Sequence, residues 1–453
     1  MRKKTLLAVL LAMVLVLSGC STIIVKDQAV EDATPILTLG DEVITRKDVI
    51  NTRDNVLLNQ YYMYASYGID PAQLGFDISN PDTIAAAQEY AVTALKNDMV
   101  LRAKAKELGL DTLTDEENAK LQEELDKRVS SDRAQVKAEL FADTELEGDA
   151  LEEAITAKMD ELGRTTEYYT KLISAEIKDT KIKDYICKDV TVTDDEVKAD
   201  FDSKVAADQE KYAENAGSYA TAANGSTTLY WTPAGVRRVK QILIKFKDED
   251  SKAISDAQAK VTSANGSIEA AQLVVDDEAA DTEAKEAAKT SLETAKAELE
   301  AAQAELDAAK KAAYANIDAD ADAVVEALAN GEDWAKLAEE KNEDPGMKSG
   351  APNAERGYAV AAGMTNFDAA FVDAALALEK VGDVSGKVAS DAYGYYIIKY
   401  VSDEAEGAVA LETVHDSIQS SLLSTKQNET YDATVKKWVD DADFKEDLDA
   451  LKD

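Results

Sequence analysis

The spacing of apolar residues predicts a mostly helical chain with two separate groups of short strands. Residues 36–39 and 43–44 are β-prone runs on either side of Gly40-Asp41, which predicts a β-hairpin. Helical patterning then continues to about residue 190. Pairs in which a threonine is followed three residues later by an acid mark helix starts. Three such pairs are present: Thr45 with Asp48, Thr114 with Glu117, and Thr193 with Glu196.

The second half of the chain changes to an α+β pattern. Residues 215–235 are rich in small and turn-forming residues, which indicates a domain boundary. The elements predicted after it are a strand at 239–246, a helix at 321–342, a helix at 366–378 and a strand at 395–401. This order predicts a small α+β domain over residues 235–402. The amphipathic pattern of residues 405–453 predicts a C-terminal helical segment.

Residues 250–316 are a low-complexity segment rich in Ala, Glu, Lys and Asp. Aliphatic residues recur every seven positions, with alanines between them. They are Ile254, Val261 and Ile268 in the first half, and Leu292, Leu299 and Leu306 in the second. The pattern breaks around residues 276–281, so we expect an antiparallel coiled-coil hairpin inserted into the α+β domain. A single long, solvated helix is the alternative.

The N-terminus has the pattern of an export signal. Arg2, Lys3 and Lys4 precede an apolar run from Leu6 to Leu17, which is short for a membrane span of about 20 residues. The following Leu17-Ser18-Gly19-Cys20 resembles the lipobox of bacterial lipoprotein signal peptides. This resemblance implies cleavage after residues 1–19, acylation of Cys20 and a tether over residues 20–34. It places the chain on the outer face of a bacterial cell membrane, anchored by lipid. An ordinary secretory signal with an incidental cysteine is the alternative.

Composition excludes several function classes. The formal net charge of −39 opposes binding to nucleic acid and to anionic lipid headgroups. The two cysteines are Cys20 and Cys187, and Cys187 lies in an apolar part of a helical pattern, where we expect a buried, inert thiol. With His415 as the single histidine, a zinc site or a histidine-dependent triad is not expected. We expect no cofactor.

Four motifs in order point to a family for residues 235–402. They are residues 239–244 (Val-Lys-Gln-Ile-Leu-Ile), 331–338 (Gly-Glu-Asp-Trp-Ala-Lys-Leu-Ala), 382–388 (Gly-Asp-Val-Ser-Gly-Lys-Val) and 393–399 (Tyr-Gly-Tyr-Tyr-Ile-Ile-Lys). Together they resemble a parvulin-type peptidyl-prolyl isomerase domain once residues 250–316 are treated as an insertion.

The flanking segments extend this resemblance. Residues 38–45, 108–117 and 192–197 resemble parts of the chaperone domain of SurA and PrsA proteins. The whole chain is therefore similar to a PrsA-type extracytoplasmic foldase. The resemblance implies a helical chaperone domain over residues 35–230, a parvulin-like domain over 235–402, and a tail, 405–453, that packs on the chaperone domain.

The resemblance also implies which residues form the isomerase site. The family carries histidines in its first and last strands, where this chain has Gln241 and Tyr396. Asp344 matches the family's Asp/Cys position, Phe371 its proline-pocket Phe, and Met364 the neighbouring Met. Each has a simpler interpretation: Met364, Phe371 and Tyr396 as core residues, Asp344 as the start of a turn, and Gln241 as a solvent-facing strand residue. Arg356 stands at the family's usual Leu position and is expected to weaken the apolar pocket.

Loss of both histidines does not by itself exclude catalysis. Prolyl isomerisation breaks no bond, and its barrier of about 18–20 kcal/mol arises from amide resonance. An apolar pocket that removes water from the amide and grips the proline ring lowers this barrier. Gln241 and Tyr396 both donate and accept hydrogen bonds, so they are expected to form a substitute network around Asp344.

Two functions remain open at this point. One is a foldase that binds unfolded or nascent secreted polypeptides and accelerates X-Pro isomerisation, with an activity weakened by the missing histidines. The other is a non-catalytic holdase chaperone with a degenerate parvulin domain. A surface structural protein built on the coiled coil is a third class, but the chaperone-like flanks argue against it.

The lipobox resemblance predicts that membrane association depends on a single thiol. Cys20→Ser should release the protein from the membrane fraction, because a serine hydroxyl does not accept the lipid. Cys187→Ser, at the cysteine expected to be buried, is the matched control and should stay with the membrane. Immunoblots of fractionated cells measure both variants, and membrane association of Cys20→Ser equal to that of the parent chain would refute the anchor.

Overall fold

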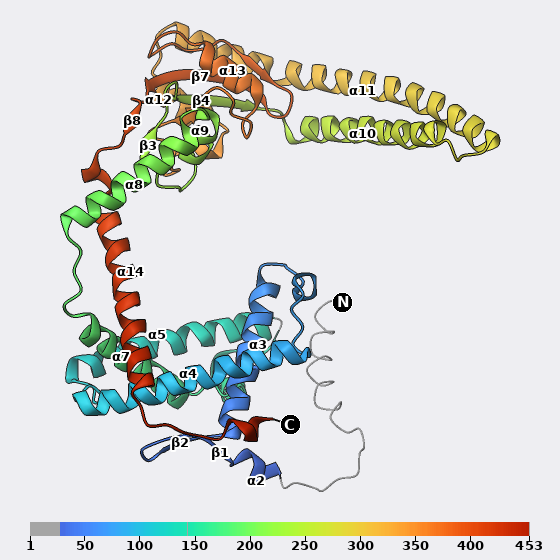
Figure 1. The fold of residues 1–453 in the computed structure, drawn as a ribbon. Helices are drawn as coiled ribbons and strands as arrows, with labels where there is room; N and C mark the ends of the chain where they lie inside the picture. The colour runs from blue at the N-terminus through green and yellow to red at the C-terminus, as the bar shows by residue number, and fades with distance from the viewer. Residues whose placement is uncertain (1–27, 143, 453) are drawn as a thin grey trace. The chain divides into compact units, whose positions relative to one another are not determined.

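The computed structural model describes residues 28–142 and 144–452, so Cys20 and the predicted signal segment lie outside the described residues. Contacts divide the chain into two compact units. One unit ends at Val192 and resumes at Ser421, and the other runs from Thr193 to Ser420 (Figure 1). The division falls within one helix, α14 (Leu411–Asp440). In the described part of the chain no helix is both long and apolar enough to cross a membrane.

The first unit contains the predicted β-hairpin. Strands β1 (Pro35–Leu39) and β2 (Glu42–Thr45) pair antiparallel around Gly40, and β9 (Lys445–Glu446) pairs with the other edge of β1. Thr45 begins α3 (Arg46–Ser66) with the predicted capping box to Asp48. The remaining elements before Val192 are α2 (Gln28–Asp32), η1 (Pro71–Leu74), α4 (Pro81–Leu108), α5 (Asp115–Leu140), α6 (Gly148–Glu161) and α7 (Thr166–Cys187).

The C-terminal end of the chain contributes to the core of this first unit. Leu451, in η3 (Leu448–Leu451), is buried with Leu37 of β1, Val49 of α3 and Met99 of α4. The backbone N–H of Asp447 donates to the carbonyl of Ile36. The two ends of the described chain are therefore held together by one small core and one sheet.

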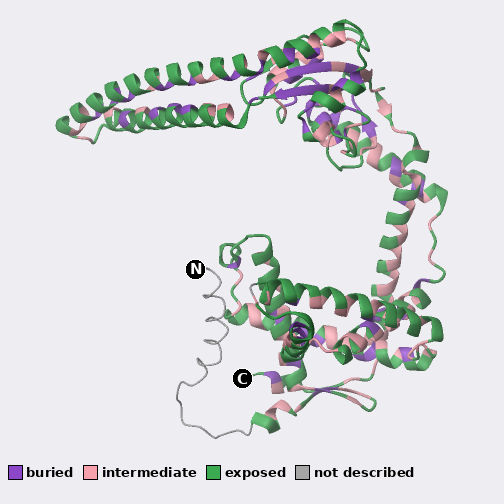
Figure 2. Cartoon of the chain, turned by 180° about the vertical axis from the view of Figure 1, so that it is seen from behind, coloured by how far each residue is buried: buried purple, intermediate pink, exposed green. Residues whose placement is uncertain are grey.

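The second unit is built on a four-stranded antiparallel sheet of order β5-β4-β7-β6. Its strands are β4 (Arg237–Lys245), β5 (Tyr358–Val360), β6 (Val388–Ser390) and β7 (Gly394–Asp403). Residues on both faces of this sheet are buried, and its strands are therefore largely purple in Figure 2. A mostly helical chain with a small α+β domain was predicted from the sequence, and this prediction is confirmed.

Alternation along β4 and β7 sends side chains to two different cores. Ile242 and Ile397 face the last part of α11 (Thr282–Ala329) and α12 (Trp334–Lys341). Leu243 and Tyr396 face α13 (Ala369–Ala377) on the other side. The sheet is thus the middle layer between two sets of helices.

Residues before β4 belong to the same unit as the sheet. They form α8 (Asp194–Tyr212), α9 (Ala216–Ala223) and β3 (Trp231–Thr232), which pairs with β8 (Gly407–Ala408). The boundary between the two compact units therefore lies at residues 192–193, whereas the domain boundary expected from the sequence lies at 230–235. The difference arises because α9 is apolar and small enough to pack on the sheet.

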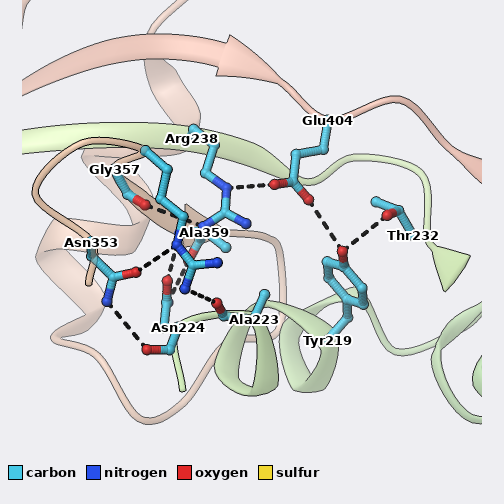
Figure 3. A network of polar contacts seen from close by, with 10 residues as sticks. Tyr219, Ala223, Asn224, Thr232, Arg238, Asn353, Gly357, Ala359 and Glu404 are labelled. Atoms are coloured by element: carbon cyan, nitrogen blue, oxygen red, sulfur yellow. Dashed lines mark hydrogen bonds and ion pairs between the residues drawn. The ribbon is translucent and has the colours of Figure 1, made fainter. Parts of the chain in front are cut away.

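Polar contacts fasten α9 and β3 to the sheet (Figure 3). The buried Arg238 of β4 donates to the carboxylate of Glu404 at 2.5 Å and to the carbonyl of Gly357 at 3.2 Å. Tyr219 of α9 donates to the same Glu404 carboxylate at 3.2 Å, and its hydroxyl lies 2.9 Å from that of Thr232. A domain cut at residue 235 would therefore lose Tyr219, which donates to the carboxylate that pairs with Arg238.

Two antiparallel helices occupy the segment predicted as an inserted hairpin. They are α10 (Asp248–Asp276) and the first part of α11, and they project from the sheet in Figure 1. Small apolar residues meet between them, as the heptads predict, with Val261 and Leu306 in one buried cluster. Asn316 donates to the Asp250 carboxylate at the base, and Lys260 pairs with Glu305 at 2.5 Å further out.

The far arm of the hairpin does not stop at residue 316. Helix α11 runs on to Ala329, where Gly331 with φ of +87° ends it, so the helix expected at 321–342 is instead the end of α11 followed by α12. Ala313 is completely buried beneath the sheet, and the ring of Tyr314 lies 5.0 Å from that of Phe246. One continuous helix therefore serves both the hairpin and the core.

This arrangement predicts which part of the hairpin is dispensable. Replacing residues 258–308 with a short Gly/Ser linker should change the free energy of unfolding by less than about 2 kcal/mol, because closing a short loop between neighbouring helices is inexpensive. Replacing residues 250–316 should cost at least about 3 kcal/mol, since it removes Ala313 and Tyr314 from the core. Urea denaturation followed by tryptophan fluorescence compares the two. Equal losses of unfolding free energy in both variants would contradict this division between the dispensable part of the hairpin and the part that belongs to the core.

Candidate functional site

The candidate polar residues Gln241 and Asp344 are in direct contact. Gln241 lies on β4 and donates from Nε2 to Oδ2 of Asp344 at 2.7 Å. Each residue is only 8% exposed, so neither the solvent-facing strand position nor a simple exposed turn describes them. Asp344 also caps the short helix η2 (Pro345–Met347), because its Oδ1 accepts from the backbone N–H of Gly346 at 2.8 Å.

The loop that carries Asp344 is tied to β4 by Asn342. The side-chain oxygen of Asn342 accepts from the backbone N–H of Leu243 at 2.9 Å and from that of Asp344 at 3.0 Å. Its side-chain nitrogen donates to the carbonyl of Gln241 at 2.9 Å. The distance between Gln241 and Asp344 is therefore set by backbone contacts as well as by their own hydrogen bond.

Tyr358 is the second donor to Asp344. Its hydroxyl, on the edge strand β5, donates to Oδ2 of Asp344 at 3.0 Å. Gly346 makes this approach possible, because a Cβ at that position would lie 2.0 Å from the Tyr358 hydroxyl oxygen. Burial beside the Asp344 carboxylate raises the pKa of Tyr358, so the phenol stays protonated and donating at neutral pH.

Gln241 retains an unused acceptor. Its Oε1 is buried and has no hydrogen-bond partner in the part of the chain that the structure describes. A buried acceptor without a donor costs about 1–3 kcal/mol of desolvation. A donor that reached this atom would remove that cost, but the groups that cover the atom would have to move first.

Aromatic rings form a continuous wall beside the polar group. Phe371 of α13 is 2% exposed and lies 5.3 Å, ring centre to ring centre, from Tyr396 of β7. Phe367 lies 5.7 Å from Phe371 and packs edge-on against Tyr358 at 5.1 Å. Tyr358 thus belongs both to the wall and to the hydrogen-bond network of Asp344.

Met364 is buried in the same core as Phe371, and the backbone at this position lies close to α9. It follows Gly363, and a Cβ on Gly217 of α9 would lie 2.5 Å from the Met364 nitrogen. Phe367 lies between Met364 and Phe371 in the chain, just before α13 begins, and its ring contacts that of Phe371.

Tyr396 joins the aromatic wall rather than the polar group. Its hydroxyl interacts with Ser390, and burial raises its pKa from 10.0 to about 12. The structure describes no hydrogen bond from Tyr396 to Gln241 or Asp344 among residues 28–142 and 144–452. The network predicted around Asp344 therefore contains Gln241 and Tyr358, with Tyr358 in the place expected for Tyr396.

Sequence reasoning missed Tyr358, Phe367 and Asn342. Two local signals were available: Phe367 is an aromatic residue four positions before Phe371, and Tyr358 directly follows Gly357. Arg356 was expected to weaken the apolar pocket. Its guanidinium instead donates to Asn353 at 3.1 Å and to the carbonyl of Ala223 in α9 at 2.8 Å.

Comparison with known families agrees with this geometry. Residues 303–402 match the family described as "Rotamase: PPIC-type PPIASE domain". These residues form a PPIC-type rotamase domain. The match begins inside α11, so the hairpin separates it from β4, but the nine paired positions of β4 with β7 make Gln241 part of the same sheet.

Curated relatives of the chain are foldases. The foldase protein PrsA of Clostridium kluyveri is 34% identical over 124 residues, which are 26% of this chain and 33% of that protein. The foldase protein PrsA of Clostridium perfringens is 25% identical over 247 residues, 54% of this chain and 58% of that protein. The chain thus spans about a third of the length of the first of these relatives. The resemblance to PrsA-type foldases with a parvulin-type rotamase domain is confirmed.

A solved structure is also similar. Peptidylprolyl isomerase (PrsA) from Bacillus cereus is 16% identical, with 93% of this chain and 100% of that chain covered and a TM-score of 0.18. Within the described residues of this chain, no group of three or more His, Cys, Asp or Glu side chains is placed to hold a metal ion.

The raised pKa of Tyr396 predicts a pH dependence of stability. Its unfolded-state pKa is near 10 and its folded-state pKa is about 12. The stabilisation is therefore fully present below pH 10 and is lost as the pH rises to about 12, because only the unfolded state then ionises freely. Tyr396→Phe should flatten the fall of the unfolding free energy over this window.

Urea unfolding at a series of pH values measures this slope. Tyr393→Phe is the matched control, because it removes a hydroxyl group from a tyrosine three residues earlier whose side chain is 52% exposed. A slope for Tyr396→Phe equal to that of the parent chain would show that the buried hydroxyl is not responsible.

Proposed function

We propose that this protein is an extracytoplasmic foldase whose rotamase domain accelerates cis–trans isomerisation of X-Pro bonds in unfolded or nascent secreted polypeptides. The contact between Gln241 and Asp344, next to the wall of Phe371 and Tyr396, is the observation that carries this proposal. Gln241, at one of the two positions where the family carries histidine, pairs with Asp344 beside an apolar surface, and this pair supports a retained site. Foldases among the curated relatives support the same function.

Desolvation provides the catalytic effect in this proposal. Water stabilises the planar, charge-separated amide more than the twisted amide, so an apolar surface lowers the barrier to rotation. The proline ring would lie against Phe371, and Phe367, which is only half-buried, would shift to admit it. Neither step requires a group that gains or loses a proton.

Gln241 would orient the peptide rather than activate it. Its Nε2 is engaged with Asp344, while its Oε1 lacks a donor among the described residues. A backbone N–H of the bound chain would satisfy this acceptor. Tyr358 and Asn342 would hold the pair in place, because both are bonded to the Asp344 loop.

The predicted lipid on Cys20 would retain the protein at the outer face of the bacterial membrane, where secreted chains emerge. The net charge of −39 supports protein clients rather than nucleic acid as partners. We propose no cofactor, since isomerisation transfers no group and no electron.

A non-catalytic holdase is the second candidate. Two observations favour it: both family histidines are replaced, and Phe371 is 2% exposed, so its ring is covered in the structure. In that case the sheet domain would serve as a platform or a weak client site.

Activity of two matched variants separates these candidates. We expect Phe371→Leu to lower kcat/KM for an X-Pro peptide about tenfold, since it narrows the surface that covers the proline ring. Ile397→Val, on the opposite face of β7, should lower the free energy of unfolding by about 0.5–1.5 kcal/mol, an amount comparable to the effect of Phe371→Leu. It should leave kcat/KM unchanged. A protease-coupled isomerisation assay on the full chain measures both.

Three results would change this conclusion. Equal activity of Phe371→Leu and the parent chain would remove Phe371 from the site. Equal losses in Phe371→Leu and Ile397→Val would show a stability effect only. A parent chain that does not accelerate isomerisation, yet suppresses aggregation of an unfolded client, would establish the holdase.

A further inference from the structure

The first unit exposes an unusual concentration of large apolar side chains. Eight of them lie between residues 58 and 90, on α3, on the turn after it and on α4. They are Leu58, Tyr61, Tyr62, Met63, Tyr67, Ile69, Leu74 and Tyr90, with exposed fractions from 38% to 76%. We call these residues the α3–α4 aromatic surface. Exposed apolar surface of this extent on a folded domain indicates a site of interaction.

A groove lies next to this surface and shares Tyr90 with it. Helices α3 and α4 pack together, and between them lies a hollow of about 780 Å³. Leu57, Gln60, Phe76, Ala87 and Tyr90 are among its lining residues. Phe76 is fixed against Tyr64 of α3 with ring centres 5.6 Å apart. The hollow therefore offers both apolar and polar side chains, and Tyr90 belongs to it as well as to the α3–α4 aromatic surface.

The charge of this region has one sign. Residues 54–95 contain no Lys, Arg or His, whereas Asp70, Asp77, Asp82 and Glu89 are all present. Asp82 itself lines the groove. Tyrosine faces attract cations, and the neighbouring carboxylates add to that attraction.

We propose that the α3–α4 aromatic surface binds extended segments of unfolded polypeptide in which apolar side chains are flanked by Lys or Arg. This inference rests on the proposed foldase function and gives it a client site separate from the rotamase residues. Tyrosine and methionine suit the task, because they offer large contact areas that adapt to different side chains. The apolar centre of the segment fills the groove, and its cations face the exposed tyrosines of the α3–α4 aromatic surface and the nearby carboxylates.

The negative charge of this region argues against three other occupants: an anionic membrane, a nucleic acid and a second copy of this chain. An anionic membrane or a nucleic acid would meet a region without a single cation between residues 54 and 95. A second copy of this chain on a two-fold axis would bring the same carboxylates opposite each other, since such an interface pairs one patch with itself. A cationic client segment is attracted by the carboxylates and avoids both of these repulsions.

The test uses the full chain and two labelled peptides with the same apolar centre, one ending in lysines and the other in glutamates. Fluorescence anisotropy should show the lysine peptide binding at least about tenfold more tightly, with the difference shrinking at high salt. Tyr67→Ser with Tyr90→Ser should weaken binding of the lysine peptide about tenfold, because these two rings are the most exposed tyrosines of the α3–α4 aromatic surface. Tyr168→Ser with Tyr185→Ser, at exposed rings elsewhere in the same unit, is the matched control and should bind as the parent chain does.

Each alternative gives a distinct result. Equal binding of the lysine peptide by the Tyr67/Tyr90 variant and the control variant would overturn the proposal. Loss of self-association in sedimentation, without loss of peptide binding, would assign the surface to a second copy instead. Loss of binding to phosphatidylcholine vesicles, again with peptide binding intact, would assign it to a lipid surface.

The isomerisation assay on the same variants keeps this inference separate from the proposed function. The Tyr67/Tyr90 variant should isomerise a short X-Pro peptide at the parent rate, because its changes lie outside the rotamase domain. Peptide binding by a parent chain without isomerase activity would leave this client site standing while the catalytic proposal failed. Isomerase activity without selective binding of the lysine peptide would leave the catalytic proposal standing while the client site failed.

Discussion

The antiparallel pairing of β4 with β7 is the constraint on which the rotamase domain depends. These two central strands share nine paired positions, from Arg237 with Asp403 to Lys245 with Gly394. The pairing sets which side chains face each core, and a slip by one residue would exchange the faces of Ile242 and Leu243. Gly394 fits only because it lacks a side chain, since a Cβ there would lie 2.2 Å from the carbonyl oxygen of Ile244.

The candidate site follows from this pairing. Gln241 and Tyr396 come from neighbouring strands but serve different groups: one bonds to Asp344 and the other stacks on Phe371. Asn342 ties the Asp344 loop to the backbone of β4, so the polar group keeps its place on the sheet. The site is thus held by bonds between the Asn342 side chain and the main chain, which do not depend on the residues at positions 241 and 396. This explains how the polar group persists without the two family histidines.

Local sequence patterns predicted much of this fold. The capping pairs at Thr45, Thr114 and Thr193 each begin a helix, and the heptads of residues 250–316 correspond to two antiparallel helices. What could not be predicted depends on packing between distant segments. Nothing local shows that α9 covers the loop before Met364, or that Tyr358 rather than Tyr396 reaches Asp344. The end of the inserted arm was also missed, because a helix that leaves a coiled coil for a protein core keeps the same period in its sequence.

The helical hairpin has a consequence for how the chain reaches its native state. Strands β4 and β7 must meet although more than a hundred residues separate them along the chain. Helices α10 and α11 pair along their heptad residues, and this pairing brings Asp250 and Asn316 together. Once they have done so, the residues between them no longer lengthen the loop that the sheet must close. Since loop-closure entropy and folding speed depend on the effective separation of the contacting segments, the insertion adds little delay to folding of the domain that carries it.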